Sequence, residues 1–210
     1  AEVIRQVAGR ATVMIHVGAV ATRDAVALAE HAQEAGADAV SSVPPIYYSV
    51  GEKAVYNHYM AIAKSVTIPM FIYHIPACAP HQLSPAFALK CCEQPNVAGM
   101  KFSDNDMYLM WSIMKACGPD FIALTGNDQM MLPGLVMGSH GAVGRNQNLM
   151  PGLFVKTYRA YCGGDLKLAE KSFAQMLGFY NILRKYGTAR IGKAVLRMLG
   201  LPAGGPRMPL

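Results

Sequence analysis

Short apolar runs of strand length alternate along the chain with longer segments in which apolar residues recur at helical spacing. The first run, Thr12–Gly18, is almost continuously apolar, which is typical of a strand covered on both faces. A helix follows from Thr22, and Gly36 closes it. Further strands are predicted at Ala37–Val43, Pro69–Ile75, Val97–Ser103, Phe121–Thr125 and Gly141–Gly144.

The remaining segments are predicted to be helical. Their ranges are 2–8, Glu52–Ser65, Ser84–Glu93, Asp106–Ala116, Met130–Met137, Gly152–Cys162, Leu166–Tyr186 and Ala189–Leu199. Repeated strand–helix units predict an α/β fold with a parallel sheet and right-handed crossovers. No strand pattern returns after Gly144, so residues 1–150 are expected to form the β/α units. Residues 151–210 are expected to form the last such helix and a C-terminal helical extension.

Two parallel architectures fit this alternation, a doubly wound open sheet and a closed barrel. The loop Gly18-Ala-Val-Ala-Thr22 after the first strand lacks the G-x-G-x-x-G pattern of nucleotide-binding open sheets. A closed barrel needs eight strands, and the pattern predicts six. Either the sheet is open, or two β/α units lie upstream of residue 1.

Composition narrows the class of protein. The 210 residues suit one domain, and 52% hydrophobic with 15% charged residues excludes a disordered or fibrous chain. The net charge of +6 comes from scattered basic residues that concentrate moderately after Lys156. No basic stripe with interleaved aromatics is present, so a nucleic-acid partner is not expected. A basic surface could instead attract an anionic small substrate.

The five cysteines show no Cys-x-x-Cys or zinc spacing, so they are predicted to be reduced residues of a cytoplasmic protein. The six histidines form no ligand pair, so no metal is expected. No apolar run is long enough to cross a membrane. The chain opens in a helix without a Met or a leader, which indicates a processed, truncated or partly observed protein.

Two side chains stand out at the ends of predicted strands. Lys101 ends a strand that is otherwise apolar, where an ammonium group is costly to bury. Tyr73 ends the preceding strand, so the two can lie side by side as a nucleophilic amine and a proton shuttle. The alternatives are a lysine with its amine in solvent and a core tyrosine with a locally bonded hydroxyl.

Other polar residues follow the later strands. Asp128, followed by Gln129, either caps the adjacent helix or takes part in a site. Arg145 either pairs with a nearby carboxylate or binds substrate, and Tyr47-Tyr48 could be a surface or interface pair.

Several of these segments match the motifs of one family. They are Val43-Pro-Pro-Ile-Tyr-Tyr48, Tyr73-His-Ile-Pro-Ala77, Gly99-Met-Lys-Phe-Ser-Asp104, Gly126-Asn-Asp128, Gly138-Ser-His-Gly-Ala-Val-Gly144 and Pro206-Arg-Met-Pro-Leu210. The chain resembles the N-acetylneuraminate lyase/dihydrodipicolinate synthase family of pyruvate-dependent aldolases, and the lyases most. The resemblance implies a (β/α)8 TIM barrel with a C-terminal helical extension, whose first two β/α units are absent from this chain. It also implies a homotetramer.

The resemblance also assigns roles. Lys101 matches the lysine that forms a Schiff base with pyruvate, Tyr73 the tyrosine that relays protons, and Tyr48 a tyrosine that reaches the neighbouring subunit's site. Ser103, Gly126 and Asp128 match positions that hold the substrate's polar chain, and Gln129 and Arg145 are predicted to bind substrate as well. The covalent imine with a 2-oxo acid implies that no other cofactor is required.

Four departures from the family pattern bear on the substrate. Gln129 replaces a glutamate of the sialate lyases, and Arg145 replaces a small hydroxyl residue. Cys78 stands where dihydrodipicolinate synthases carry an arginine. The loop that cradles the keto-acid carboxylate would lie before residue 1.

The expected reaction is cleavage of N-acetylneuraminate to pyruvate and N-acetylmannosamine. The alternatives are another aldolase or dehydratase acting on a 2-keto-3-deoxy sugar acid, and a condensation like that of dihydrodipicolinate synthase. A non-catalytic truncated relative is the alternative from another class.

Overall fold

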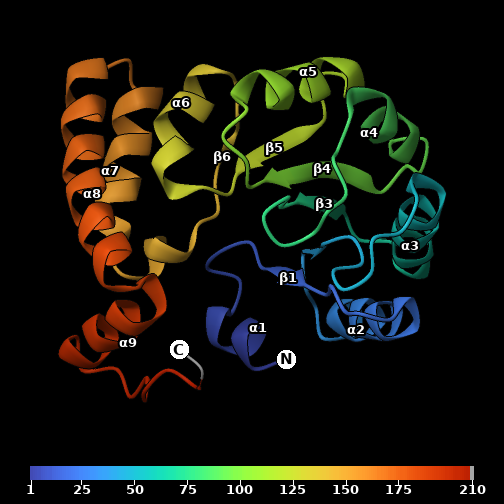
Figure 1. Ribbon diagram of the computed structural model, residues 1–210, viewed down its shortest axis with the longest axis horizontal. Coiled ribbons are helices and arrows are strands. Elements are labelled where there is room, and N and C mark those ends of the chain that lie inside the picture. Colours follow the sequence, from blue (N-terminus) through green and yellow to red (C-terminus); the bar gives the residue numbers. More distant parts are fainter. Residues whose placement is uncertain (209–210) are drawn as a thin grey trace.

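The strands form one parallel sheet in which every strand pairs with its neighbours in the chain (Figure 1). The computed structural model describes residues 1–208. In order, the strands are β1 (Met14–His16), β2 (Ala39–Ser42), β3 (Met70–His74), β4 (Val97–Phe102), β5 (Ile122–Thr125) and β6 (Gly141–Ala142). A doubly wound sheet reverses its strand order at a switch point, and this sheet does not. The doubly wound alternative is therefore wrong.

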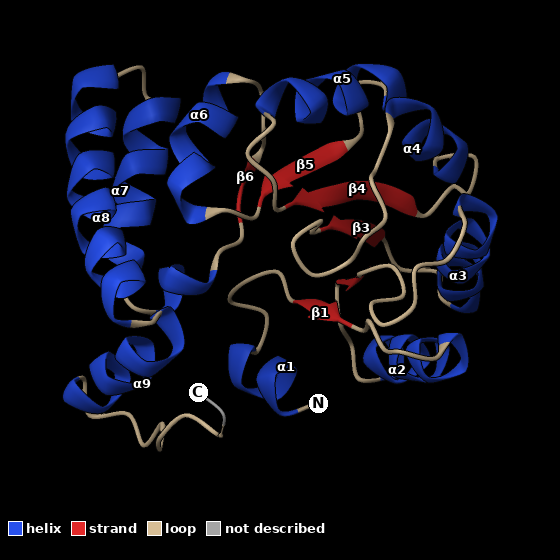
Figure 2. Ribbon diagram, in the orientation of Figure 1, coloured by secondary structure: helices blue, strands red, loops and turns tan. Residues whose placement is uncertain are grey.

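The helices among the described residues are α1 (Glu2–Val7), α2 (Thr22–Glu34), α3 (Glu52–Ser65), α4 (Pro85–Cys91), α5 (Met107–Cys117), α6 (Met131–Val136), α7 (Pro151–Cys162), α8 (Leu166–Tyr186) and α9 (Thr188–Met198). Of these, α2 to α6 cover one face of the sheet, and α7 and α8 pack beside α6. Figure 2 shows α2 to α6 around the convex side of a curled sheet. Right-handed crossovers that all advance in one direction place their helices on the same face. This arrangement confirms the α/β prediction and is consistent with part of a TIM barrel.

The later part of the chain departs from the predicted boundaries. Strand β6 has two residues, whereas Gly141–Gly144 was expected. Val143 still donates its N–H to the Thr125 carbonyl oxygen at 2.8 Å, but the chain then enters a short 3-10 helix. The helix expected from Met130 is likewise preceded by a 3-10 turn. Both changes place polar residues directly after strand ends. Of the Pro206–Leu210 string, residues 209–210 lie outside the described part.

The main hydrophobic core lies between the sheet and helices α2 to α5. Ile62 of α3, Met100 of β4 and Ile113 of α5 are fully buried in it. Each such side chain contributes about 1.5–3 kcal/mol to folding. A second cluster, formed by Met131, Leu135, Phe154 and Met176, joins α6, α7 and α8. The core therefore holds the strand ends of β3 to β5 at fixed positions.

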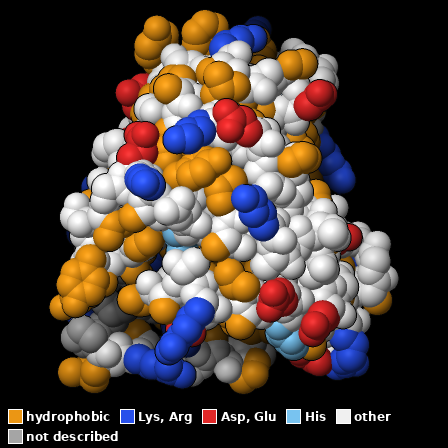
Figure 3. All heavy atoms as spheres, turned by 90° about the vertical axis from the view of Figure 1, so that its right-hand side faces the viewer, with side chains coloured by type: hydrophobic (Ala, Val, Ile, Leu, Met, Phe, Trp, Pro, Cys, Tyr) orange, Lys and Arg blue, Asp and Glu red, His pale blue; other side chains and the backbone are white. Residues whose placement is uncertain are grey.

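The outer surface carries both positively and negatively charged side chains. Figure 3 shows Lys and Arg side chains interspersed with Asp and Glu on the side where α3 and α4 lie. This face therefore carries no single-sign field of the kind that binds nucleic acid. Within residues 1–208, no helix combines the length and the apolar character required to span a bilayer.

Candidate active site

Lys101 and Tyr73 lie directly beside each other at the carboxyl ends of β4 and β3. The two residues are register partners in the parallel ladder. The Lys101 Nζ atom lies 4.0 Å from the centroid of the Tyr73 ring. Both side chains are half-buried. The Lys101 amine therefore packs against the Tyr73 ring. The alternative prediction, in which the amine extends freely into solvent, does not describe this arrangement.

His16 of β1 joins this pair, and sequence reasoning missed it. Its imidazole meets the Tyr73 ring edge-on, with ring centroids 5.6 Å apart and an interplanar angle of 83°. The Nδ1 atom lies 3.4 Å from the Ser41 hydroxyl oxygen. Burial lowers the pKa of His16, and the Lys101 charge lowers it further. Both effects disfavour a charged imidazole beside Tyr73. The one sequence feature that could have indicated a role for His16 is its polar side chain within a predicted apolar strand.

Asp128 is a buried carboxyl group at the end of β5, with 6% of the residue exposed. Its Oδ2 atom accepts a hydrogen bond from the Asn146 backbone N–H at 3.2 Å. Oδ1 has no hydrogen-bond partner among the described residues. Burial raises the pKa of Asp128, while the Asn146 hydrogen bonds and the charges of Arg145 and Lys101 act against it.

Asp128 does not cap the helix that follows it. Asn127 occupies the N-cap position of the 3-10 turn, and no side chain bonds to that turn's backbone. The capping alternative is therefore wrong. The carboxylate instead packs on Gly144, where a Cβ atom would overlap it.

Ser103 and Gly126 form the adjoining part of the site after β4 and β5. Ser103 is buried, and its Oγ atom has no hydrogen-bond partner in the described structure. A Cβ atom on Gly126 would overlap that hydroxyl, so the close approach of the two strands requires glycine. Buried polar atoms without partners are unfavourable unless a ligand satisfies them.

The remaining predicted residues differ in their placement. The Gln129 amide donates to the Asn105 Oδ1 atom at 3.4 Å, which leaves it outside the Lys101–Tyr73 pair. Arg145 is exposed after β6 and forms no ion pair within residues 1–208, so the alternative of a carboxylate pairing is wrong. Tyr48 is 71% exposed and packs edge-on against Tyr47, with ring centroids 4.9 Å apart. No contact brings it to Lys101.

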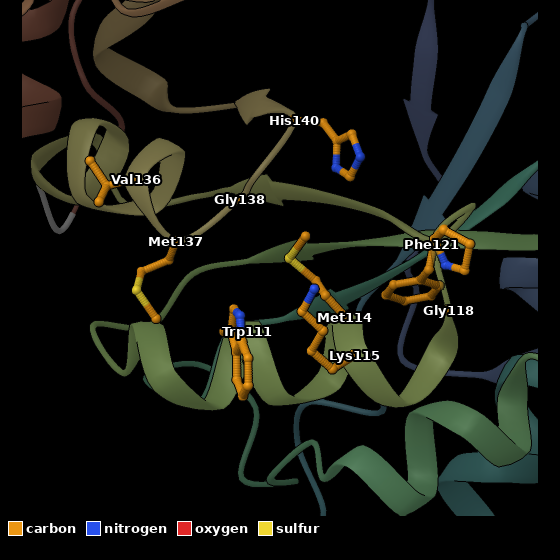
Figure 4. A pocket seen from close by; sticks show the side chains of 10 residues that line it. Trp111, Met114, Lys115, Gly118, Phe121, Val136, Met137, Gly138 and His140 are labelled. Carbon is orange, nitrogen blue, oxygen red and sulfur yellow. The ribbon is translucent and has the colours of Figure 1, made fainter. Parts of the chain in front are cut away.

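A separate cavity of about 520 Å³ lies at the other end of the strands (Figure 4). Its lining includes Trp111 and Met114 of α5, Val136 of α6, and Phe121 and His140 near the starts of β5 and β6. Active sites in β/α barrels lie at the carboxyl ends of the strands. This cavity is therefore not the site of the chemistry discussed above. In the described chain, no group of three His, Cys, Asp or Glu residues could hold a metal ion.

The family comparisons now bear on this geometry. Residues 1–210 match the sequence profile of the Dihydrodipicolinate synthetase family. The chain belongs to this family. The N-acetylneuraminate lyase of Rhizobium meliloti is 35% identical over 208 residues, covering 99% of this chain and 69% of that protein. The 4-hydroxy-tetrahydrodipicolinate synthase of Archaeoglobus fulgidus is 29% identical, covering 100% and 73%.

Solved structures of family members have the same fold. The structure of CdNal from Clostridium difficile in complex with mannosamine matches with a TM-score of 0.94 at 27% identity, over 98% of this chain and 71% of that one. Dihydrodipicolinate synthase from Aquifex aeolicus matches with a TM-score of 0.91 at 30% identity, over 99% and 71%. The resemblance seen in the sequence is confirmed. Family members are pyruvate-dependent lyases and synthases, and both classes are among the relatives.

Proposed function

We propose that this protein is a lyase that forms a Schiff base through Lys101 and cleaves, or forms, a carbon–carbon bond next to a pyruvate unit. The observation that carries the proposal is the Lys101 amine resting on Tyr73 at the strand ends. A lysine amine and an adjacent hydroxyl are the two groups that this chemistry needs.

The reaction begins when the unprotonated Lys101 amine attacks the 2-oxo carbon. Loss of water leaves an iminium ion conjugated to the carboxyl group. Tyr73 relays the proton of the hydroxyl on the carbon beyond the bond to be broken: its oxygen accepts that proton while its own phenolic proton passes to water. The bond breaks, and an aldehyde leaves. The electron pair moves into the iminium as an enamine. Reprotonation at carbon and hydrolysis then release pyruvate and restore the amine.

N-acetylneuraminate is the proposed substrate, giving pyruvate and N-acetylmannosamine. The 35% identity to a lyase of this name supports it. The buried oxygens of Ser103 and Asp128 that lack partners are positioned to bond the hydroxyl groups of a sugar chain. Another 2-keto-3-deoxy sugar acid, or a condensation like that of the related synthases, is the second candidate because both classes share the fold.

We also propose that the six units correspond to the last six of an eight-unit barrel. The alignment over 69% of the Rhizobium relative supports this proposal. A homotetramer in the cytoplasm is the assembly we expect. The reaction needs no metal or organic cofactor, because the lysine iminium is itself the electron sink.

The test is to incubate the protein with pyruvate and borohydride, and then to measure intact mass and map peptides. Reduction should fix a pyruvyl adduct on the Lys101 peptide, and Lys101→Ala should abolish it. Lys115→Ala is the matched control, because Lys115 lies on α5 over Trp111 and away from the strand ends. A folded protein without the adduct would exclude Schiff-base chemistry. Pyruvate release from N-acetylneuraminate then tests the substrate.

A further inference from the structure

Three buried oxygens in a row at the strand ends lack hydrogen-bond partners. Within residues 1–208 they are Ser103 Oγ, Asp128 Oδ1 and Asn146 Oδ1. Their residues are 7%, 6% and 2% exposed. They follow β4, β5 and β6 in turn, so they form a row from the strand of Lys101 toward Arg145. We call this row of three oxygen atoms the ledge. Such atoms call for hydroxyl or N–H donors from a ligand.

Arg145 stands at the far end of this ledge. It directly precedes Asn146 and begins the 3-10 helix after β6. Its guanidinium is exposed and makes no ion pair with any described carboxylate. A guanidinium presents paired N–H donors that match a carboxylate.

The charges around Arg145 permit an anionic ligand. Asp128 is an acidic group that interacts with the charge of Arg145, and burial raises the pKa of Asp128, which weakens its repulsion of an anionic ligand. Asp104 follows β4, two strands away from Arg145, and its Oδ2 atom lies 3.4 Å from His74 Nε2. Lys101 adds a positive charge, which the iminium ion would retain. The site therefore balances Lys101 and Arg145 against one partly compensated carboxyl group.

We propose that the substrate carries a second anionic group, most simply a carboxylate, which Arg145 binds at the end distant from the 2-oxo acid. This inference rests on the proposed function, because Lys101 must hold the 2-oxo end. Strands β4 and β6 are separated by β5, so the two ends lie about two inter-strand spacings apart, roughly 10 Å. The ligand class is a hydroxylated 2-oxo dicarboxylate, with its hydroxyl groups along the ledge. N-acetylneuraminate has one carboxyl group, so this inference selects the second candidate of the proposed function, another 2-keto-3-deoxy sugar acid, over N-acetylneuraminate.

The test compares 2-oxo acids that differ only in the distant group. 2-Oxoglutarate, 2-oxoadipate and 2-oxopimelate are each paired with the 2-oxo monocarboxylate of equal chain length. Borohydride trapping on Lys101 gives the concentration at which each acid half-saturates the adduct. The readout is the ratio of the two half-saturating concentrations within each pair. A general loss of imine formation affects both acids of a pair equally and leaves this ratio unchanged. The variants are Arg145→Gln and Arg145→Lys.

In the unaltered protein, at least one dicarboxylate should half-saturate at about a tenfold lower concentration than its partner, as expected for a charged hydrogen bond. Arg145→Gln should bring that ratio close to one, and Arg145→Lys should keep part of it. The control is Arg159→Gln, which removes the same charge near the end of α7. Arg159 adjoins Tyr158, whose hydroxyl donates a hydrogen bond to the His140 carbonyl oxygen just before β6. This contact is at the opposite end of β6 from Arg145.

Four results would overturn the inference. No preference in any pair, or a preference that survives Arg145→Gln, rejects the role of Arg145 while leaving the Schiff base intact. A preference lost equally in Arg159→Gln reduces it to a general charge effect. Failure of every acid, pyruvate included, to mark Lys101 rejects the proposed function and this inference together.

Discussion

The nitrogen of the Lys101 side chain lies over the Tyr73 ring, 4.0 Å from its centroid. The ring and the hydroxyl of Tyr73 can therefore have separate roles. The ring orients the amine through a cation–π contact, which is worth about 0.5–2 kcal/mol. The hydroxyl is free to move protons during carbon–carbon cleavage.

Substitution at Tyr73 should separate these roles. Tyr73→Phe keeps the ring, so pyruvate should still mark Lys101 within a few-fold of the normal rate. Cleavage should fall about 10²–10⁴-fold, because general acid–base catalysis is lost. Tyr73→Ala should impair both steps. The measurements are borohydride trapping and pyruvate release. Equal loss of trapping in both variants would contradict a separate role for the ring.

His16 should act by supporting Tyr73. His16→Ala removes the edge contact, an interaction worth about 0.5–1.5 kcal/mol, so adduct formation should slow by up to about tenfold. His16→Phe retains an aromatic edge and should keep most of the rate. Single-turnover trapping measures both. If Phe and Ala behave alike, the imidazole nitrogens, and the contact of Nδ1 with Ser41, matter more than the ring edge.

Asp128→Asn should stabilise the fold at neutral pH. Burial raises the pKa of Asp128, so the folded state binds its proton more tightly than the unfolded chain does. The charged carboxyl group therefore destabilises the folded protein above the raised pKa. The advantage of the variant should shrink as pH falls through that pKa toward the ordinary value near 3.8.

Urea unfolding of both proteins across this pH range measures the difference. Asp120→Asn, which changes an exposed carboxyl group before β5, is the matched control. A gap that is constant with pH would show that titration of Asp128 is not its cause.

Gly144→Ala should disturb the site through Asp128. The backbone at Gly144, with φ −123° and ψ 156°, accepts alanine, but the added Cβ atom overlaps the Asp128 carboxylate. The expected cost is about 1–3 kcal/mol of folding stability. The KM for a hydroxylated substrate should also rise, because Asp128 must move.

Gly178→Ala is the matched substitution for this test. Gly178 lies within α8 with open space around its Cβ position, so alanine should stabilise the protein by about 0.5–1 kcal/mol. Thermal unfolding compares the two variants. A Gly144→Ala protein as stable as the parent would show that the carboxylate shifts freely.

The sequence by itself determined the order and type of the elements and the central pair of residues. The predicted bounds of α3 and α8 agree with the structure, and β4 differs by one residue. These elements have long, regular apolar patterns, and a periodicity of this kind reports burial directly. Lys101 and Tyr73 were predictable together, because parallel neighbouring strands end at one edge of a sheet.

Only the tertiary structure decided the contacts that join distant segments. Curling of the sheet brings His16 of β1 to Tyr73 of β3, two strands away. The chain after β6 folds back, so the Asn146 N–H donates a hydrogen bond to Asp128. The local sequence pattern around Asp128 is equally compatible with a helix cap and does not predict this contact. Such contacts depend on strand register and sheet curvature, which arise from packing summed over many residues. Several separate segments of the sequence carry the side chains of this site, and the assembled sheet sets the distances between them.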